Sequence, residues 1–178
     1  MSASVPADGA PDARALRSAI DGLPRPDAVA ALVRVGGTDG SWRGSAGVHD
    51  RPTDGWAAGG IISTTADPER FTTALFGGRV VRGPLLEEMF TLPDASVRTH
   101  GSGEPARFSA GLSVFTLGGR QVWGKTGGRW GYNSVVAATR DLSRTPVYSV
   151  GATDAKGKDV NATAMGIVVA AFGAPPAA

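Results

Sequence analysis

The segment Val122–Gly128 holds residues whose types and spacing indicate chemistry. It reads Val-Trp-Gly-Lys-Thr-Gly-Gly, so that Lys125 and Thr126 are followed by two glycines. A lysine ammonium and a threonine hydroxyl can both donate hydrogen bonds to a carboxylate. Glycines let another backbone lie close to the strand, and the backbone N–H of Gly128 can donate to an oxyanion. The pattern predicts a binding site for a carboxylate-bearing ligand, although so short a motif also occurs as a strand end with an exposed lysine.

Three segments, of which one contains the motif, form a wider pattern. Gly124–Val135 reads Gly-Lys-Thr-Gly-Gly-Arg-Trp-Gly-Tyr-Asn-Ser-Val, and Ala58–Asp67 reads Ala-Gly-Gly-Ile-Ile-Ser-Thr-Thr-Ala-Asp. Val33–Asp50 has the composition of a hairpin whose first strand ends in glycine. In their order along the chain, which is Val33–Asp50, Ala58–Asp67 and then Gly124–Val135, and followed by an apolar C-terminal helix, the segments resemble the serine β-lactamase-like family. That family includes D-alanyl-D-alanine carboxypeptidases and class C β-lactamases, and the resemblance extends over almost the whole chain.

The resemblance has implications for fold, site and location. It implies an α+β fold with an antiparallel sheet flanked by N- and C-terminal helices, in a bacterial family of serine hydrolases that act through an acyl-serine. No metal or cofactor is implied. The family is usually secreted or periplasmic, whereas this chain as written shows no signal peptide and by itself indicates the cytoplasm, so the location stays unknown. The substrate-binding residues that the resemblance implies are Lys125, Thr126, Gly127, Gly128 and Trp130.

The nucleophile of that family has no counterpart in this sequence. Family members carry a Ser-x-x-Lys helix and then a Tyr-x-Asn or Ser-x-Asn loop between the first hairpin and the Ala-Gly-Gly segment. Here no serine has a lysine three residues later, neither tyrosine has an asparagine two residues later, and His49–Thr53 leads directly to Gly55–Ala57. An unactivated serine hydroxyl is a poor nucleophile. We therefore predict a single, internally truncated domain over residues 1–178, with the deletion near residues 53–55 and no catalytic residue of its own.

Three functions fit these features. The first is an inactive remnant of a carboxypeptidase-like hydrolase that keeps the substrate strand. The second is a non-catalytic module that binds a carboxylate-bearing small molecule or peptide through the Lys-Thr-Gly strand. The third is half of an enzyme that a partner chain completes. Because Ser63 and Ser134 lack an activating lysine in sequence, we expect them to make local hydrogen bonds, and we expect His49 and His100 to be surface residues.

Composition excludes several classes of protein. A chain of 178 residues with 42% hydrophobic and 19% charged residues is typical of one globular domain. The absence of cysteine excludes a disulfide scaffold and a thiol nucleophile, and two histidines leave little for a metal site. No apolar run approaches the roughly 18 residues of a membrane span. The net charge of +2 is scattered along the chain, without the basic cluster of a nucleic-acid-binding protein.

The elements that must position Lys125 follow from hydrophobic periodicity and turn residues. Residues 1–10 are predicted to be flexible, and residues 93–107 to form a loop. Helices are predicted over residues 12–23, 67–76, 84–90 and 158–172. A hairpin is predicted over residues 28–48, and an antiparallel meander over 109–117, 121–125, 132–139 and 145–153.

The composition of the strands predicts how the sheet is covered. Three of them are apolar on both faces, as in a sheet with helices on both sides: residues 28–35, 133–139 and 146–152. We expect the terminal helices to cover one face and the two central helices to cover the other. The family adds a nucleophile helix and an all-α lobe on that second face. We therefore predict an exposed apolar patch beside Lys125, a candidate surface for self-association.

Overall fold

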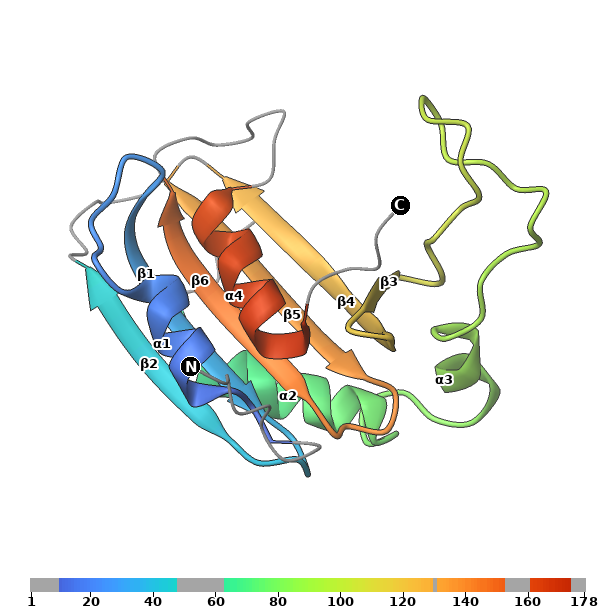
Figure 1. Cartoon of the computed structure of the whole chain (residues 1–178). Coiled ribbons are helices and arrows are strands. Elements are labelled where there is room, and N and C mark those ends of the chain that lie inside the picture. Colours follow the sequence, from blue (N-terminus) through green and yellow to red (C-terminus); the bar gives the residue numbers. More distant parts are fainter. Residues whose placement is uncertain (1–9, 48–62, 130, 153–160, 174–178) are drawn as a thin grey trace.

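One antiparallel sheet of six strands and four helices make up the described part of the chain, residues 10–47, 63–129, 131–152 and 161–173 (Figure 1). The strands are β1 (Ala28–Gly36), β2 (Trp42–Gly47), β3 (Ser113–Leu117), β4 (Arg120–Arg129), β5 (Tyr132–Thr139) and β6 (Thr145–Ala152). The helices are α1 (Ala13–Ile20), α2 (Ala66–Phe76), α3 (Pro84–Glu88) and α4 (Ala162–Phe172). The predicted α+β class is confirmed. The predicted deletion near residues 53–55 lies outside the described residues and stays a prediction.

The sheet joins two locally connected units. Its strand order is β2-β1-β6-β5-β4-β3, and every pair is antiparallel. The predicted hairpin forms β1 and β2, and the predicted meander forms β3 to β6. The two units meet where β1 pairs with β6, with Ala31 opposite Val150 and Val33 opposite Tyr148. Lys125 therefore lies in the meander, on the strand next to one end of the sheet.

Helices α1 and α4 begin at side chains that accept hydrogen bonds from free backbone N–H groups. The Asp12 carboxylate accepts from the N–H groups of Arg14 and Ala15 at 3.0 and 2.9 Å, at the start of α1. The Asn161 side chain accepts from the N–H of Ala164 at 3.0 Å, at the start of α4. Such caps satisfy donors that have no partner within the helix. Among the described helices, none combines the length and the apolar composition that crossing a bilayer requires.

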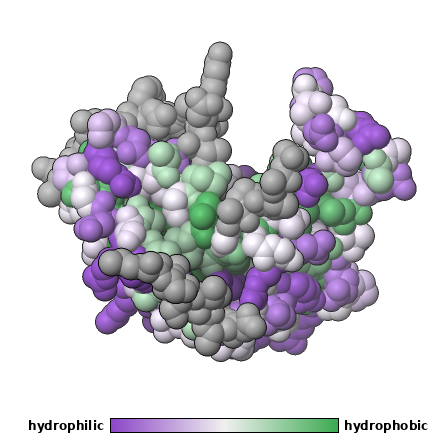
Figure 2. All heavy atoms as spheres, viewed as in Figure 1, coloured by the Kyte–Doolittle hydropathy of each residue, from purple (hydrophilic) through white to green (hydrophobic). Residues whose placement is uncertain are grey.

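Helices cover both faces of the sheet, as the sequence predicts. The α1 and α4 helices lie on one face, where Leu16 and Ile167 are fully buried against the strands. The α2 helix lies on the other face, where Leu75 and Phe76 pack with Trp123 (Figure 1). The α1/α4 side of the molecule has apolar surface over α4 (Figure 2), which includes the partly exposed Met165 and Val169.

Strand boundaries differ from the predicted ones at two places. The fourth strand was expected over residues 121–125 but continues to Arg129. Its glycines have low intrinsic strand preference, and pairing with β5 along the whole segment outweighs that preference. The strand expected from residue 109 begins only at Ser113, because a tight turn precedes it. In this turn the Ser109 N–H donates to the Leu112 carbonyl at 2.8 Å, and Gly111 has a φ of +94°.

The turn between β5 and β6 supplies a pH-dependent contribution to stability. Hydrogen bonds from Thr139 and Ser143 to the Asp141 carboxylate lower its pKa to about 2. The folded-state pKa lies below the ordinary value, so the contribution is present above about pH 4 and is lost as the pH falls toward 2. We expect the Asp141→Asn variant to lose less stability than the wild type over that interval. Urea unfolding from pH 5 to 2 measures this, and parallel curves for the two proteins would contradict it.

Candidate functional site

The segment Lys125–Gly128 lies where one side of β4 has no neighbouring strand. On its other side β4 pairs with β5, with Lys125 opposite Val136 and Gly128 opposite Asn133. Strand β3 pairs with β4 only as far as Gly124. Beyond that residue no described strand covers the outer side of β4. We call Lys125–Gly128 the open edge, because an extended ligand can pair with its backbone there.

The side chains of the open edge are accessible. All four of its residues are exposed. The Lys125 ammonium donates to the backbone carbonyl of Thr126 at 3.0 Å. Lys125 forms no ion pair with any residue in the described part of the chain. A cation that meets only a neutral acceptor can form a stronger, charge-assisted hydrogen bond with an incoming carboxylate.

The two polar side chains of the motif lie on opposite faces of β4. Side chains alternate between the faces of a strand. Val122 belongs to the core beneath α1 and α4, and Trp123 belongs to the core beneath α2. Lys125 therefore shares the α2 face with Trp123, and Thr126 shares the α1/α4 face with Val122. One ligand can reach both side chains only by passing around the open edge.

Glycines bring β4 close to β5 beside this edge. A Cβ atom at Gly124 would lie 2.6 Å from the Cβ and 2.7 Å from the Cα of Ala137. A Cβ atom at Gly127 would lie 2.7 Å from the Oγ atom of Ser134. All three distances are shorter than real Cβ contacts. At Gly124 the obstacle includes backbone atoms, so the strand can hold this position only with glycine there, whereas at Gly127 the obstacle is a side-chain hydroxyl that can rotate.

Ser134 is a polar residue beside the motif that is not among the predicted substrate-binding residues. It is exposed, and it lies opposite Gly127 on the α2 face of the sheet. Nine positions separate Ser134 from Lys125 in sequence, yet the register places them two residues apart along adjacent strands. The connection of β4 to β5 is two residues long, so Arg129 pairs with Tyr132 and, two residues further along each strand, Gly127 pairs with Ser134. A predicted hairpin with this connection is therefore the sequence signal that places Ser134 beside the motif.

The aromatic residues near the motif and the two histidines have different settings. Trp123 is buried and meets the Phe90 ring edge-on, with centroids 5.4 Å apart, so it belongs to the core. Tyr132 is half-buried at the start of β5. His100 is exposed in the long loop, as predicted. Trp130 and His49 are outside the described residues.

Ser63 has a local structural role at the start of α2. Its hydroxyl donates to the Asp67 carboxylate at 3.2 Å. The hydroxyl and N–H of Thr64 donate to the same carboxylate at 3.0 and 3.4 Å. These hydrogen bonds, Thr64 first, lower the pKa of Asp67. The arrangement agrees with the predicted hydrogen-bonding role of Ser63.

One row of paired residues crosses five strands on the α2 face beside the open edge: Gly127, Ser134, Ser149, Leu32 and Ser45. Leu32 is the apolar member of the row, and its side chain is 46% exposed. This row alone does not form the expected apolar patch beside Lys125, and the patch stays a prediction.

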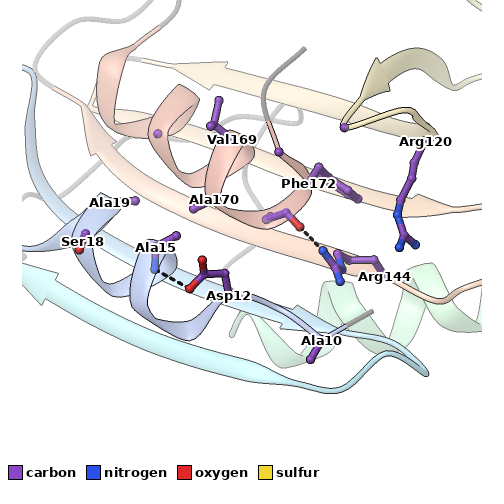
Figure 3. A pocket seen from close by; sticks show the side chains of 14 residues that line it. Ala10, Asp12, Ala15, Ser18, Ala19, Arg120, Arg144, Val169, Ala170 and Phe172 are labelled. Carbon is purple, nitrogen blue, oxygen red and sulfur yellow. Dashed lines mark hydrogen bonds between the residues drawn. The ribbon is translucent and has the colours of Figure 1, made fainter. Parts of the chain in front are cut away.

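A separate pocket of about 680 Å³ lies on the α1/α4 face (Figure 3). Arg120 and Arg144 line one end, and the Asp39 carboxylate lies 3.3 and 3.6 Å from their guanidinium groups. Arg144 also donates to the backbone carbonyl of Ala171 at 2.6 Å, near the end of α4. Burial lowers the pKa of Arg144, and neighbouring Arg120 adds to the effect. These contacts join α4 to the strands, and the pocket does not include the open edge.

Comparison with known proteins places the chain in a family. The Beta-lactamase family model matches residues 5–172. No curated protein matches the chain. A D-stereospecific amidohydrolase from a Streptomyces species is similar in structure, with 27% sequence identity and a TM-score of 0.49. The match covers 62% of this chain and 30% of the amidohydrolase, so this chain corresponds to less than one third of that protein.

The family match extends across every described strand and helix, including the open edge with Lys125. The antiparallel sheet, with α1 and α4 on one face, agrees with the fold that the sequence resemblance implies. The chain therefore belongs to the beta-lactamase family of serine hydrolases.

Proposed function

We propose that this chain binds a carboxylate-bearing peptide or small molecule along the open edge of β4 and does not hydrolyse it alone. The observation that carries the proposal is the position of Lys125. Its ammonium is exposed, has no described carboxylate partner, and lies beside strand backbone that β3 leaves uncovered. A charged donor next to an unpaired strand edge suits an extended ligand with a terminal carboxylate.

Each residue of the site has a proposed part in binding. Lys125 donates to the ligand carboxylate, and Thr126 contacts the ligand from the other face of the strand. Gly127 leaves room for the ligand backbone, and the N–H of Gly128 donates to a ligand carbonyl. Trp130 lies outside the described residues, and its part in substrate binding stays a prediction.

The proposed lack of hydrolysis follows from two missing groups. Acyl transfer needs an activated nucleophile, and the chain contains no Ser-x-x-Lys sequence. In the family, the second donor of the oxyanion hole is the backbone N–H of that nucleophile. With the N–H of Gly128 alone, a tetrahedral intermediate would lose one of its two stabilising donors. Removing one such donor typically slows acyl transfer by about 100- to 1,000-fold.

A fluorescent penicillin tests both parts of the proposal, because it carries a carboxylate and a reactive acyl group. We expect saturable binding by fluorescence anisotropy and no covalent adduct on a denaturing gel. Lys125→Ala should raise the Kd about tenfold, since hydrogen bonds to charged groups are worth about 1.5 to 3 kcal/mol. Esterifying the probe carboxylate should weaken binding to a similar extent.

Arg43→Ala is the matched control for Lys125→Ala. Arg43 is an exposed cation on β2, and the strand register places it on the same face and in the same row as Lys125. We expect its removal to leave the Kd unchanged. Equal effects of the two substitutions would mean that general charge attracts the probe, and a covalent adduct would disprove the inactive state.

A second candidate is half of an enzyme that another chain completes. It is favoured by the exposure of Leu32, which is 46% accessible although β1 lies inside the sheet. Co-purification followed by penicillin labelling tests it. A covalent adduct that forms only in a hetero-complex would support completion by a partner, and an unlabelled complex would contradict it. Self-association through this face also stays a prediction.

A further inference from the structure

A second donor lies beside the open edge, on the neighbouring strand β5 and on the same face as Lys125. We propose that Ser134 is a specificity-determining residue, and that its hydroxyl and the Lys125 ammonium bind the two oxygens of one ligand carboxylate. The inference rests on the proposed function and deepens it. It replaces the expectation that Ser134 serves only local hydrogen bonding in its strand.

The strand register brings the two donors together. Ser134 lies opposite Gly127 on β5, and Lys125 lies two residues before Gly127 on β4. Residues related in this way are diagonal neighbours on one face of an antiparallel pair. Their Cα atoms are roughly 7–8 Å apart, which long side chains can span. The lysine ammonium can therefore reach a ligand that also contacts the serine hydroxyl.

The hydroxyl of Ser134 lies over β4. The position that a Cβ atom would take on Gly127 is only 2.7 Å from the Ser134 Oγ atom. Because Gly127 has no side chain, nothing on that residue separates the hydroxyl from the open edge. Gly127 thus has a second proposed part, which is to give Ser134 access to the ligand.

Neighbouring hydroxyl groups are less well placed. Thr126 is adjacent to Lys125 in sequence but lies on the opposite face of β4. It pairs with Val135, which belongs to the core beneath α1 and α4. Ser149 lies on the correct face but one strand further from the edge, and it is half-buried. Of these three hydroxyl-bearing residues, Ser134 is therefore the one on the face of Lys125 that lies next to β4.

The chemistry of the pair favours a free acid over a neutral end group. A carboxylate has two acceptor oxygens, and an ammonium and a hydroxyl supply donors to both. A carboxylic ester carries no charge, and of its two oxygens only the carbonyl oxygen is a good acceptor, so it satisfies one of the two donors. The pair should therefore determine how strongly the site prefers the acid form of a ligand to its ester.

The fluorescent penicillin and its methyl ester measure that preference. We expect Ser134→Ala to raise the Kd of the acid about tenfold and that of the ester less than twofold. Ser134→Thr keeps the hydroxyl and should stay within about twofold of the wild type for both probes. Ser45→Ala is the matched control, because Ser45 is exposed in the same row on the far strand β2, and it should change neither Kd.

Gly127→Ala gives an independent test by displacing the hydroxyl rather than removing it. The added Cβ atom would occupy a position 2.7 Å from the Ser134 Oγ atom. We expect Gly127→Ala to weaken binding of the acid at least as much as Ser134→Ala does, since it also takes room from the ligand backbone. The double variant should be little weaker than Gly127→Ala alone, because the added Cβ atom already displaces the hydroxyl that Ser134→Ala removes.

The outcomes separate this inference from the proposed function. If Lys125→Ala weakens acid binding while Ser134→Ala behaves like Ser45→Ala, Ser134 has no such role and the proposed function stands. If the wild type does not prefer the acid to the ester, both are wrong. A loss on Ser134→Ala that Ser134→Thr restores supports the inference.

Discussion

Replacing Gly124 by alanine is expected to lower the free energy of unfolding by about 3 kcal/mol, because the new methyl group has no space. Gly124 is buried between Ser113 on β3 and Ala137 on β5. Its Cβ atom would overlap the backbone carbonyl oxygen of Val136 and lie 2.7 Å from the Cα atom of Ala137. These are backbone atoms, which no change of rotamer can move. The strands would have to separate beside Lys125.

Urea denaturation measures this loss, and the penicillin anisotropy assay should show weaker binding by the same variant. Gly166→Ala is the matched control. Gly166 lies in α4 with an ordinary contact of 3.8 Å at its Cβ position, so alanine should be neutral or stabilise the helix by up to about 1 kcal/mol. If Gly124→Ala were as stable as Gly166→Ala, the close approach of β4 and β5 would be wrong.

Replacing Ile167 by alanine is expected to cost about 3 to 4 kcal/mol, because it leaves a cavity under α4. Ile167 is completely buried in the core between α4 and the sheet. Leu16 of α1 is equally buried in that core, so the two terminal helices depend on the same packing. A loss of this size is a large fraction of the 5 to 15 kcal/mol that stabilises a typical domain.

Denaturant unfolding with a constant slope is the measurement for this substitution. Val169→Ala on the same helix is the control, since Val169 is 36% exposed and its truncation should change stability by about 0.5 kcal/mol or less. Similar losses for the two variants would show that α4 does not bury Ile167 against the sheet.

Hydrophobic and turn patterns in the sequence predict most of the helices and strands. The pairing between strands determines where some strands end and which strands are neighbours. The bounds of β5 agree with the predicted ones because Gly131 and the Asp141 turn mark both of its ends. The extension of β4 to Arg129 was missed because glycines weaken the strand signal. The partners of β1 were only partly predictable, because its pairing with β6 joins segments that are far apart in sequence.

The candidate site was predictable to a similar degree. The motif identified Lys125 and its neighbours as candidates, and strand alternation alone would have placed Thr126 on the other face. Spacing within one segment predicts only local hydrogen bonds for Ser134, because it compares residues that are close together in the sequence. Its nearness to Lys125 depends on the register of two strands, which becomes definite only when the turn between them is known.

The pairing of β1 with β6 also has a consequence for biosynthesis. Val150 follows its partner Ala31 by more than 100 residues, so the apolar β1 is translated long before the strand that covers its inner side. At roughly 5 to 20 residues per second, the wait is on the order of 10 s. The early hairpin can pair β1 with β2 only, which leaves an unpaired apolar edge on the nascent chain. Chaperone binding to this hairpin on the ribosome is the expected safeguard.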